Sequence, residues 1–259
     1  MESYIVSFAT AFIMFVLDML FAKLFPLSKA NYKTEKTVGE LRKKYQSFDI
    51  KQIFFFLALT TAFIFILFKL FSILVDFNLS LLSDVVIIVK PYPEMLFIIS
   101  LFSAMLLASL AMFIISKWQL KNEWEEYLAY LSCKYKYNYI KVYGYTIKIL
   151  TVVTGLLIIL FLDWYSAFGQ NEIKINGLLG IGAKTYSYSE IIKIKDVERL
   201  KAPNGNIVDE PHFIIEFSDG EKWNSRDNGF SNYAQNKNII HFITAKISIE
   251  PLKVEFDNQ

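Results

Sequence analysis

Charged side chains inside apolar runs are the residues most able to carry chemistry in this sequence. Asp18, Lys69 and Lys148 each lie within an apolar stretch long enough to cross a membrane. Ionisable groups at membrane depth are costly and mark functional sites by default. Asp18 and Lys148 fall at similar depth near one face, and this depth favours a structural ion pair over a proton or ion relay. Lys69, toward the opposite face, is expected either to snorkel or to meet Asp163 or Asp84.

Other catalytic or ligand-binding patterns are missing from the sequence. His212 and His241 are the only histidines, and Cys133 is the only cysteine, so no intrachain disulfide can form and no zinc-ligand spacing is present. There is no G-x-S-x-G nucleophile elbow. Residues 177–182 contain three glycines but lack the lysine and helix start of a phosphate loop. We therefore predict no catalytic residues, no metal, no cofactor and no enzymatic activity.

The elements that position these residues follow from the blocked distribution of apolar side chains. Apolar residues make up 54% of the 259 positions, and Phe alone occurs 24 times. They gather in four runs, residues 4–25, 52–75, 95–116 and 145–162, each near the ~20 residues that span a bilayer as a helix. We predict an α-helical membrane bundle of about four transmembrane helices over residues 1–165.

Lysine and arginine distribution predicts the orientation of these helices. The segment 23–51 carries eight basic residues and the segment 117–143 carries five, whereas residues 76–94 carry only Lys90. Basic loops stay in the cytoplasm. We therefore expect 23–51 and 117–143 to be cytoplasmic loops of a multi-pass protein in the bacterial plasma (inner) membrane, with both termini outside the cytoplasm. The formal net charge of only +2 gives no reason to expect nucleic-acid binding.

Both basic segments contain an amphipathic helical stripe. The first stripe consists of Val38, Leu41, Tyr45 and Phe48, and the second of Trp124, Leu128, Leu131 and Tyr135. Such stripes usually bury intramolecularly, so we expect the two to pack on each other. The alternative is that they dock a cytoplasmic partner or lie on the membrane surface.

The sequence changes character in the C-terminal segment 166–259. Short alternating runs suggest strands, and residues 218–221 give a hairpin-turn signal. Apolar residues at helical spacing near 238–245 predict one amphipathic helix. This order predicts a small β-barrel or sandwich capped by one helix.

Particular residues in this segment resemble the pleckstrin-homology-like (PH-like) domains appended to many bacterial membrane proteins. The resemblance rests on Asp163-Trp164-Tyr165, on the run Lys184-Thr185-Tyr186-Ser187-Tyr188-Ser189-Glu190-Ile191, and on Ile214-Ile215-Glu216-Phe217-Ser218-Asp219-Gly220 followed by Trp223. It implies a bent seven-stranded barrel plugged by a helix, and a structural role for Tyr186, Tyr188, Ile191, Phe217, Asp219, Gly220 and Trp223. Lipid-binding members of the wider family carry basic residues around the first hairpin. Here that hairpin offers mainly Lys184, so phosphoinositide binding is not supported.

These observations lead to three functional hypotheses. The first is a non-enzymatic integral membrane protein whose PH-like domain mediates protein or membrane-surface interaction, including self-association through residues 166–259. The second is a membrane immunity or stress protein paired with an envelope-acting toxin. The third, a small transporter or channel subunit, would call for several inward polar residues, a broken helix or an internal repeat.

The predicted topology can be tested with a reporter enzyme. A reporter that is active only outside the cytoplasm, fused after Gln259, should be active because the basic loops hold the other side of the bundle in the cytoplasm. Activity of a cytoplasm-only reporter at the same position would overturn the topology.

Overall fold

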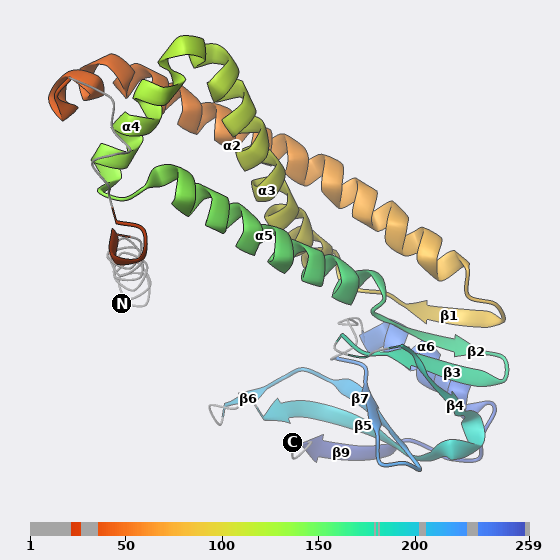
Figure 1. Cartoon of the computed structure of the whole chain (residues 1–259). Coiled ribbons are helices and arrows are strands. Elements are labelled where there is room, and N and C mark those ends of the chain that lie inside the picture. The colour runs from red at the N-terminus through yellow and green to blue at the C-terminus, as the bar shows by residue number, and fades with distance from the viewer. Residues whose placement is uncertain are drawn as a thin grey trace. The chain divides into compact units, whose positions relative to one another are not determined.

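The chain divides into two compact units. The computed structural model describes residues 22–26, 36–178, 180, 182–201, 206–226 and 233–256 (Figure 1). The first unit, Met1–Leu67 with Leu101–Gly155, is called the helical unit here. The second, Phe68–Ser100 with Leu156–Gln259, is called the sheet unit. Three long helices pass from one unit into the other.

Three helices in the described part of the chain are long and apolar enough to cross a membrane. They cover Val38–Ser80, Pro93–Tyr135 and Tyr139–Leu162. The expectation of several helices able to span a membrane is confirmed for these three. The fourth predicted helix, residues 4–25, lies outside the described residues except for its last few positions, so the count of four stays a prediction.

Helix α2 (Val38–Ser80) is much longer than the apolar run that suggested it. It starts at a capping box, in which Thr37 N donates to Glu40 Oε2 at 2.8 Å and Glu40 N donates to Thr37 Oγ1 at 3.4 Å. At ~1.5 Å per residue the helix is about 65 Å long, roughly twice the ~30 Å of bilayer hydrocarbon. Its charged first third must therefore project beyond the hydrocarbon.

The segment after α2 and β1 forms a helix, a break and a second helix. Helix α3 (Pro93–Leu120) begins with a proline at its first position, where a missing N–H costs nothing. A 3₁₀ turn, η2 (Lys121–Glu123), follows, and Lys121 adopts a φ of 46°. Helix α4 (Trp124–Tyr135) then ends at Lys136, which has a left-handed φ of 61°. This break redirects the chain at the basic end of the helical unit.

The two amphipathic stripes pack on each other, as expected. Leu41 and Tyr45 of α2 are fully buried against Tyr127, Tyr130 and Leu131 of α4. The buried face of α4 is turned relative to the predicted stripe: the two tyrosines enter the cluster, whereas Leu128 is half-buried and Tyr135 is exposed. Tyr127 and Tyr130 face α2 because both of their hydroxyl groups donate to Asp49 on that helix.

Helix α5 (Tyr139–Leu162) completes the helical part of the chain. Asn138 caps it, since its Oδ1 accepts the backbone N–H of Lys141 at 3.1 Å. The helix therefore starts six residues before the apolar run 145–162. This extension places Tyr139 and Tyr143 on α5, in the helical unit.

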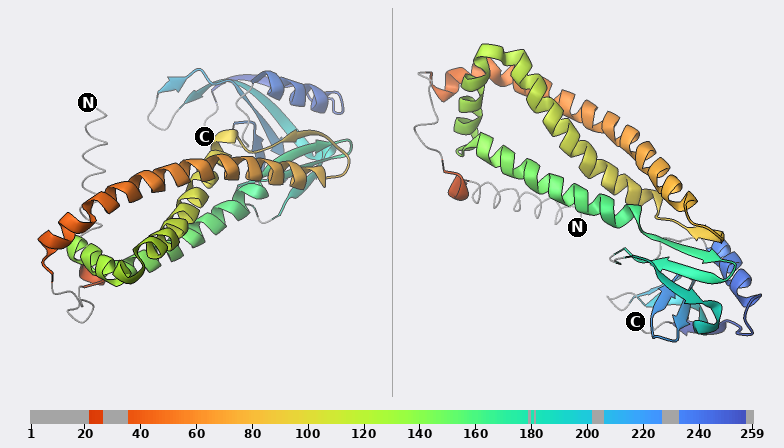
Figure 2. Two further views of the ribbon diagram at one scale, coloured as in Figure 1. Left: turned by 90° about the horizontal axis from the view of Figure 1, so that it is seen from above. Right: turned by 45° about the vertical axis from the view of Figure 1, so that its right-hand side comes forward.

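The sheet unit contains two sheets that curl into a half-barrel (Figure 2). The first has the order β1-β2-β3-β4, and the second the order β6-β5-β7-β8 with β9 parallel to β5. The strands are β1 (Val85–Val89), β2 (Tyr165–Gly169), β3 (Glu172–Asn176), β4 (Lys184–Ser187), β5 (Ile191–Lys201), β6 (Ile207–Val208), β7 (His212–Phe217), β8 (Lys222–Asn224) and β9 (Leu252–Phe256). A short 3₁₀ helix, η3 (Tyr188–Glu190), links β4 to β5.

Strand β1 was not expected, because its residues lie between two predicted membrane helices. It pairs antiparallel with β2, with Val89 opposite Ser166 and Ile88 opposite Ala167. The first sheet therefore begins with a strand that precedes the rest of the domain by about 80 positions in the sequence. The sheet unit accordingly takes in residues 68–100 as well as the predicted C-terminal region.

Helix α6 (Tyr233–Thr244) lies over the strands and closes the core. Its buried Ile239, Ile240 and Ile243 pack in one cluster with aromatic side chains such as Trp223 and Phe217. The predicted helix at 238–245 and the β-rich character are confirmed. The helix is not the last element, however, because the chain returns as β9, which was not predicted although its Leu-Lys-Val-Glu-Phe run alternates apolar and charged residues.

The β1–β2 connection can be tested at Gly169. A Cβ there would lie 2.8 Å from the backbone oxygen of Asp84 and 3.1 Å from that of Glu172. Neither backbone group can rotate away, so Gly169→Ala should destabilise the sheet unit by about 1–3 kcal/mol. The matched control is Gly177→Ala, where a Cβ meets nothing within 4 Å and the change should stay within about 1 kcal/mol. Thermal unfolding of the full chain followed by tryptophan fluorescence makes the comparison; equal effects would contradict this view of the junction.

Candidate functional site

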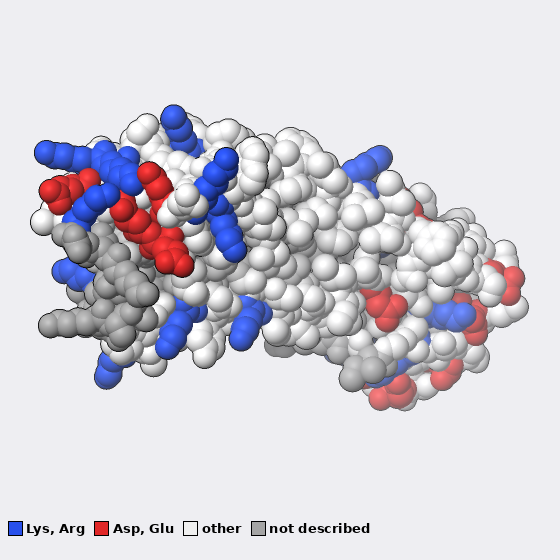
Figure 3. Space-filling model, turned by 45° about the horizontal axis from the view of Figure 1, so that its top comes forward, with Lys and Arg blue, Asp and Glu red and all other residues white. Residues whose placement is uncertain are grey.

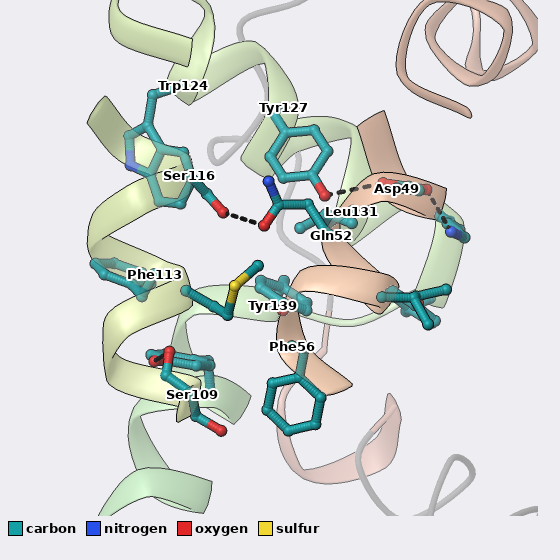
Figure 4. A pocket seen from close by; sticks show the side chains of 15 residues that line it. Asp49, Gln52, Phe56, Ser109, Phe113, Ser116, Trp124, Tyr127, Leu131 and Tyr139 are labelled. Carbon is teal, nitrogen blue, oxygen red and sulfur yellow. Dashed lines mark hydrogen bonds and ion pairs between the residues drawn. The ribbon is translucent and has the colours of Figure 1, made fainter. Parts of the chain in front are cut away.

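A cavity of about 400 Å³ opens in the helical unit (Figure 4). Helices α2, α3, α4 and α5 all contribute to its lining. Its volume falls within the ~300–1,000 Å³ of typical small-molecule sites. Most of its lining is aromatic or aliphatic, with a few polar groups at defined positions, so the cavity has the composition of a ligand pocket.

Asp49 is the centre of the polar part of the lining. It accepts hydrogen bonds from the Tyr127 hydroxyl at 2.9 Å and the Tyr130 hydroxyl at 3.1 Å, and it pairs with Lys134 Nζ at 2.7 Å. The three partners recur at positions i, i+3 and i+7 of α4, which places them on one face of that helix. Three donor groups therefore hold the carboxylate from one side, and only 14% of the Asp49 side chain is exposed.

A second polar contact joins α2 to α3 across the cavity wall. Ser116 Oγ donates to Gln52 Oε1 at 2.9 Å, and Gln52 Nε2 donates to Gln119 Oε1 at 3.2 Å. Because these amide and hydroxyl groups satisfy one another, the polar part of the lining is fixed before any ligand arrives.

Six aromatic residues of the cavity lining contact one another in succession. Their centroids are 6.2 Å apart between Tyr135 and Tyr139, 6.3 Å between Tyr139 and Tyr143, and 5.0 Å between Tyr143 and Phe113. Phe113 meets Trp124 edge-on at 5.2 Å, and Trp124 lies 6.2 Å from Tyr127. We call these six residues the aromatic belt: Phe113, Trp124, Tyr127, Tyr135, Tyr139 and Tyr143.

The Asp49–Lys134 ion pair closes the aromatic belt. Tyr127, at one end, donates to Asp49, and the Lys134 ammonium lies 5.3 Å above the ring of Tyr135 at the other end. Contacts of this kind between rings and between a cation and a ring each add roughly 0.5–1.5 kcal/mol. The belt therefore forms a continuous circuit of contacts, with its only formal charges at the junction.

Basic side chains gather at this end of the helical unit (Figure 3). Its described residues carry twelve Lys and Arg against five Asp and Glu, an excess of seven positive charges. Some of this charge is compensated by Glu126, which pairs with Lys36 at 2.9 Å and Lys44 at 2.8 Å and accepts the Tyr45 hydroxyl at 3.0 Å. The net excess of seven, in which Glu126 is already counted, gives the region a positive field.

The predicted intramembrane charge pairs are not assembled among the described residues. Asp18 lies outside the described residues, so its pairing with Lys148 stays a prediction. Lys148 is exposed, and its Nζ lies 5.5 Å from the ring centroid of Tyr145. Lys69 and Asp163 are both exposed, and within the described ranges the structure brings Lys69 to neither Asp163 nor Asp84. The snorkelling alternative fits the exposed position of Lys69.

The residues of the PH-like resemblance converge in the core of the sheet unit. The ring of Tyr186 stacks on Phe217 at 3.9 Å, and its hydroxyl donates to Asp219 Oδ2 at 3.1 Å. Burial, reinforced by the Asp219 carboxylate, raises the pKa of Tyr186 to about 12. Gly220 has a φ of 87°, which the turn after Asp219 requires.

The other residues of that group fix the two sheets to each other. Trp223 is fully buried, and its Nε1 donates to Ser166 Oγ at 3.1 Å. The Tyr188 hydroxyl donates to the backbone oxygen of Gly169 at 2.6 Å, and Ile191 is buried in the same core. These contacts are structural, because each hydroxyl or N–H meets a group of the core.

Within the described part of the chain, no group of three or more His, Cys, Asp or Glu side chains could hold a metal ion. His212 is buried on β7 with its Nδ1 2.9 Å from the backbone oxygen of Glu210, whereas His241 is exposed on α6.

No protein-family model matches the chain. No curated protein and no solved structure matches it either. Function is therefore inferred from the geometry of the chain.

The sequence contained a signal for the cavity that the periodicity of apolar residues does not register. Tyr127, Tyr130 and Lys134 lie on one helical face, and Tyr135, Tyr139 and Tyr143 recur every four residues across a helix break. Counting aromatic and polar spacing together would have selected both sets. Asp49 gave no such signal, because it is one acid among many charges in a basic segment.

The Asp49 network can be tested by a conservative change. Asp49→Asn removes the charge that faces Lys134 and two tyrosines, so it should destabilise the protein by about 1–3 kcal/mol. The matched control is Asp76→Asn, which breaks the Asp76–Lys90 pair at 2.8 Å, where the side chains are 60% and 57% exposed. An exposed pair contributes at most about 1 kcal/mol. In lipid nanodiscs, the unfolding temperature of Asp49→Asn should lie well below that of the control. The reverse order would contradict the network's role.

Proposed function

We propose that this is a non-enzymatic integral protein of the bacterial plasma membrane whose C-terminal, PH-like β domain is an interaction module at the membrane surface. The observation that carries the proposal is the pairing of β1 with β2. A strand from between two membrane helices forms the edge of the domain's first sheet. The domain is thereby built onto the helices rather than joined to them by a flexible linker.

Short connections support this reading. Helix α2 ends at Ser80 and β1 begins at Val85, β1 ends at Val89 and α3 begins at Pro93, and only two residues separate α5 from β2. Within the sheet unit, Asn78 Nδ2 also donates to the backbone oxygen of Leu162 at 2.9 Å, which ties the end of α2 to the end of α5. A domain attached at three helix ends samples few orientations, which lowers the entropic cost of binding a partner at the surface.

The chemistry of the domain surface favours a protein partner over anionic lipid. Three strands each expose a large apolar residue to solvent: Ile192 on β5, Ile207 on β6 and Leu252 on β9. Each of these residues is more than half exposed. From residue 166 onward the chain carries eleven Lys and Arg against thirteen Asp and Glu, an excess of two negative charges. Polybasic lipid binding needs the opposite balance. The distribution of basic residues predicts that this domain lies outside the cytoplasm, and we expect the partner on that side.

The proposal can be tested by site-specific photocrosslinking in native membranes. A photoreactive residue at Leu252, which is 52% exposed on β9, should give a discrete protein adduct, whether with another protein or with a second copy of the chain. The control position is Leu156 on α5, which is 56% exposed on an apolar helix and expected to face lipid. Absence of a Leu252 adduct, or equal adducts from both positions, would reject the interaction module.

A further inference from the structure

The cavity lies where two helices change from charged to apolar sequence. On α2 it takes its lining from Asp49 to Phe56, on both sides of Lys51, and the next charge is Lys69. On α3 the lining residues Ser109 to Ser116 end directly before Lys117. Such a transition marks the boundary between hydrocarbon and headgroups, where Trp and Tyr also concentrate. The molecules that are always present at this boundary are membrane lipids.

The lining suits one hydrocarbon chain with a polar end. Ile53, Phe56, Met112 and Leu131 supply apolar surface, and the aromatic belt adds ring surface to the same lining. Asp49, Gln52 and Ser116 mark the polar side, as Figure 4 shows. An amphiphile can bury its hydrocarbon chain against the apolar residues and keep its polar headgroup beside Asp49, Gln52 and Ser116. Apolar groups then meet apolar groups, and polar groups meet polar groups.

The charges of the lining select against a cationic ligand. Asp49 is matched by Lys134 at 2.7 Å, so the lining carries no net negative charge. The Lys134 ammonium already lies over two rings, 5.5 Å from Tyr130 and 5.3 Å from Tyr135. A second cation entering the aromatic belt would meet this ammonium, which repels it. The aromatic composition alone would have suggested a quaternary ammonium site.

The surroundings of the cavity favour an anionic headgroup. Lys51 and Lys117 are exposed, directly follow or precede lining residues, and form no ion pair with any residue in the described part of the chain. They belong to the excess of seven positive charges in the described helical unit. Each basic residue near a membrane surface strengthens the attraction to anionic lipid.

From these contacts we propose that the cavity is a binding site for one anionic phospholipid, with an acyl chain inside the aromatic belt and the phosphate near Lys51 and Lys117. This site is separate from the β domain, which carries an excess of acidic residues, and goes beyond the interaction function proposed for that domain.

Native mass spectrometry of the full-length protein tests the proposal. The protein is released from nanodiscs that contain equal amounts of phosphatidylglycerol and phosphatidylcholine with identical acyl chains. We expect one phosphatidylglycerol to be retained per chain, in preference to phosphatidylcholine. The Lys51→Gln/Lys117→Gln variant should lower this retention by about tenfold or more.

Two substitutions of similar size separate the cavity from the general lipid shell. Ser109→Phe adds a ring inside the cavity and should abolish specific retention. Thr61→Phe adds the same ring at an exposed position of α2 outside the cavity lining and should leave retention unchanged. Thermal unfolding confirms that both variants are folded. Retention that survives Ser109→Phe, equal retention of the two lipids, or no retained lipid in the unaltered protein would each overturn the proposal.

Discussion

The architecture depends on the hydrogen-bonded pairing of Val85–Val89 with Tyr165–Gly169. This ladder makes the connection between two long apolar helices the first strand of a folded domain. It also dictates local requirements, since Gly169 must remain a glycine beside the backbone of Asp84 and the Tyr188 hydroxyl must reach the Gly169 carbonyl. The core then extends from this edge through Phe168, whose ring meets Trp223 edge-on at 5.2 Å. Within the sheet unit, the ends of the long helices and the β strands are therefore joined by covalent and hydrogen bonds.

In the helical unit, ion pairs between acidic and basic side chains organise the packing. Its basic loops serve as the topology signal in the sequence, yet the structure uses some of the same lysines as internal partners. Glu126 gathers Lys36, Lys44 and Tyr45, and Asp49 gathers Lys134 and two tyrosines. Two acidic residues in the basic segments thus hold the helices together. The excess of lysine and arginine gives the surface a positive electrostatic potential. This division explains why a region with a large positive excess can still contain a cavity whose lining has no net charge.

Local and periodic features of the sequence were sufficient for much of this description. Long apolar runs predicted three of the helices, and the spacing of Leu41, Tyr45 and Leu131 predicted that the two stripes pack together. Tyr186, Phe217 and Trp223 were selected by their resemblance to a motif, and they do lie in the core. Strand β1 was missed because its partner lies about 80 positions away and no local pattern encodes that pairing. The aromatic belt was missed because its members come from three helices and one break in the chain.

During synthesis, strand β1 is made well before its partner strand β2, which lies about 80 positions later in the chain. Its five residues, Val-Val-Ile-Ile-Val, form an uncharged and strongly β-prone edge. At about 5–20 residues per second, the ribosome reaches Tyr165–Gly169 on the order of ten seconds after β1 has been made. Throughout that interval helices α3, α4 and α5 are synthesised while the strand lacks its native neighbour. Proline residues directly after it, at 91 and 93, and Lys90 beside it limit how far a wrong pairing could extend. The first sheet can therefore close only after helices α3, α4 and α5 have all been synthesised.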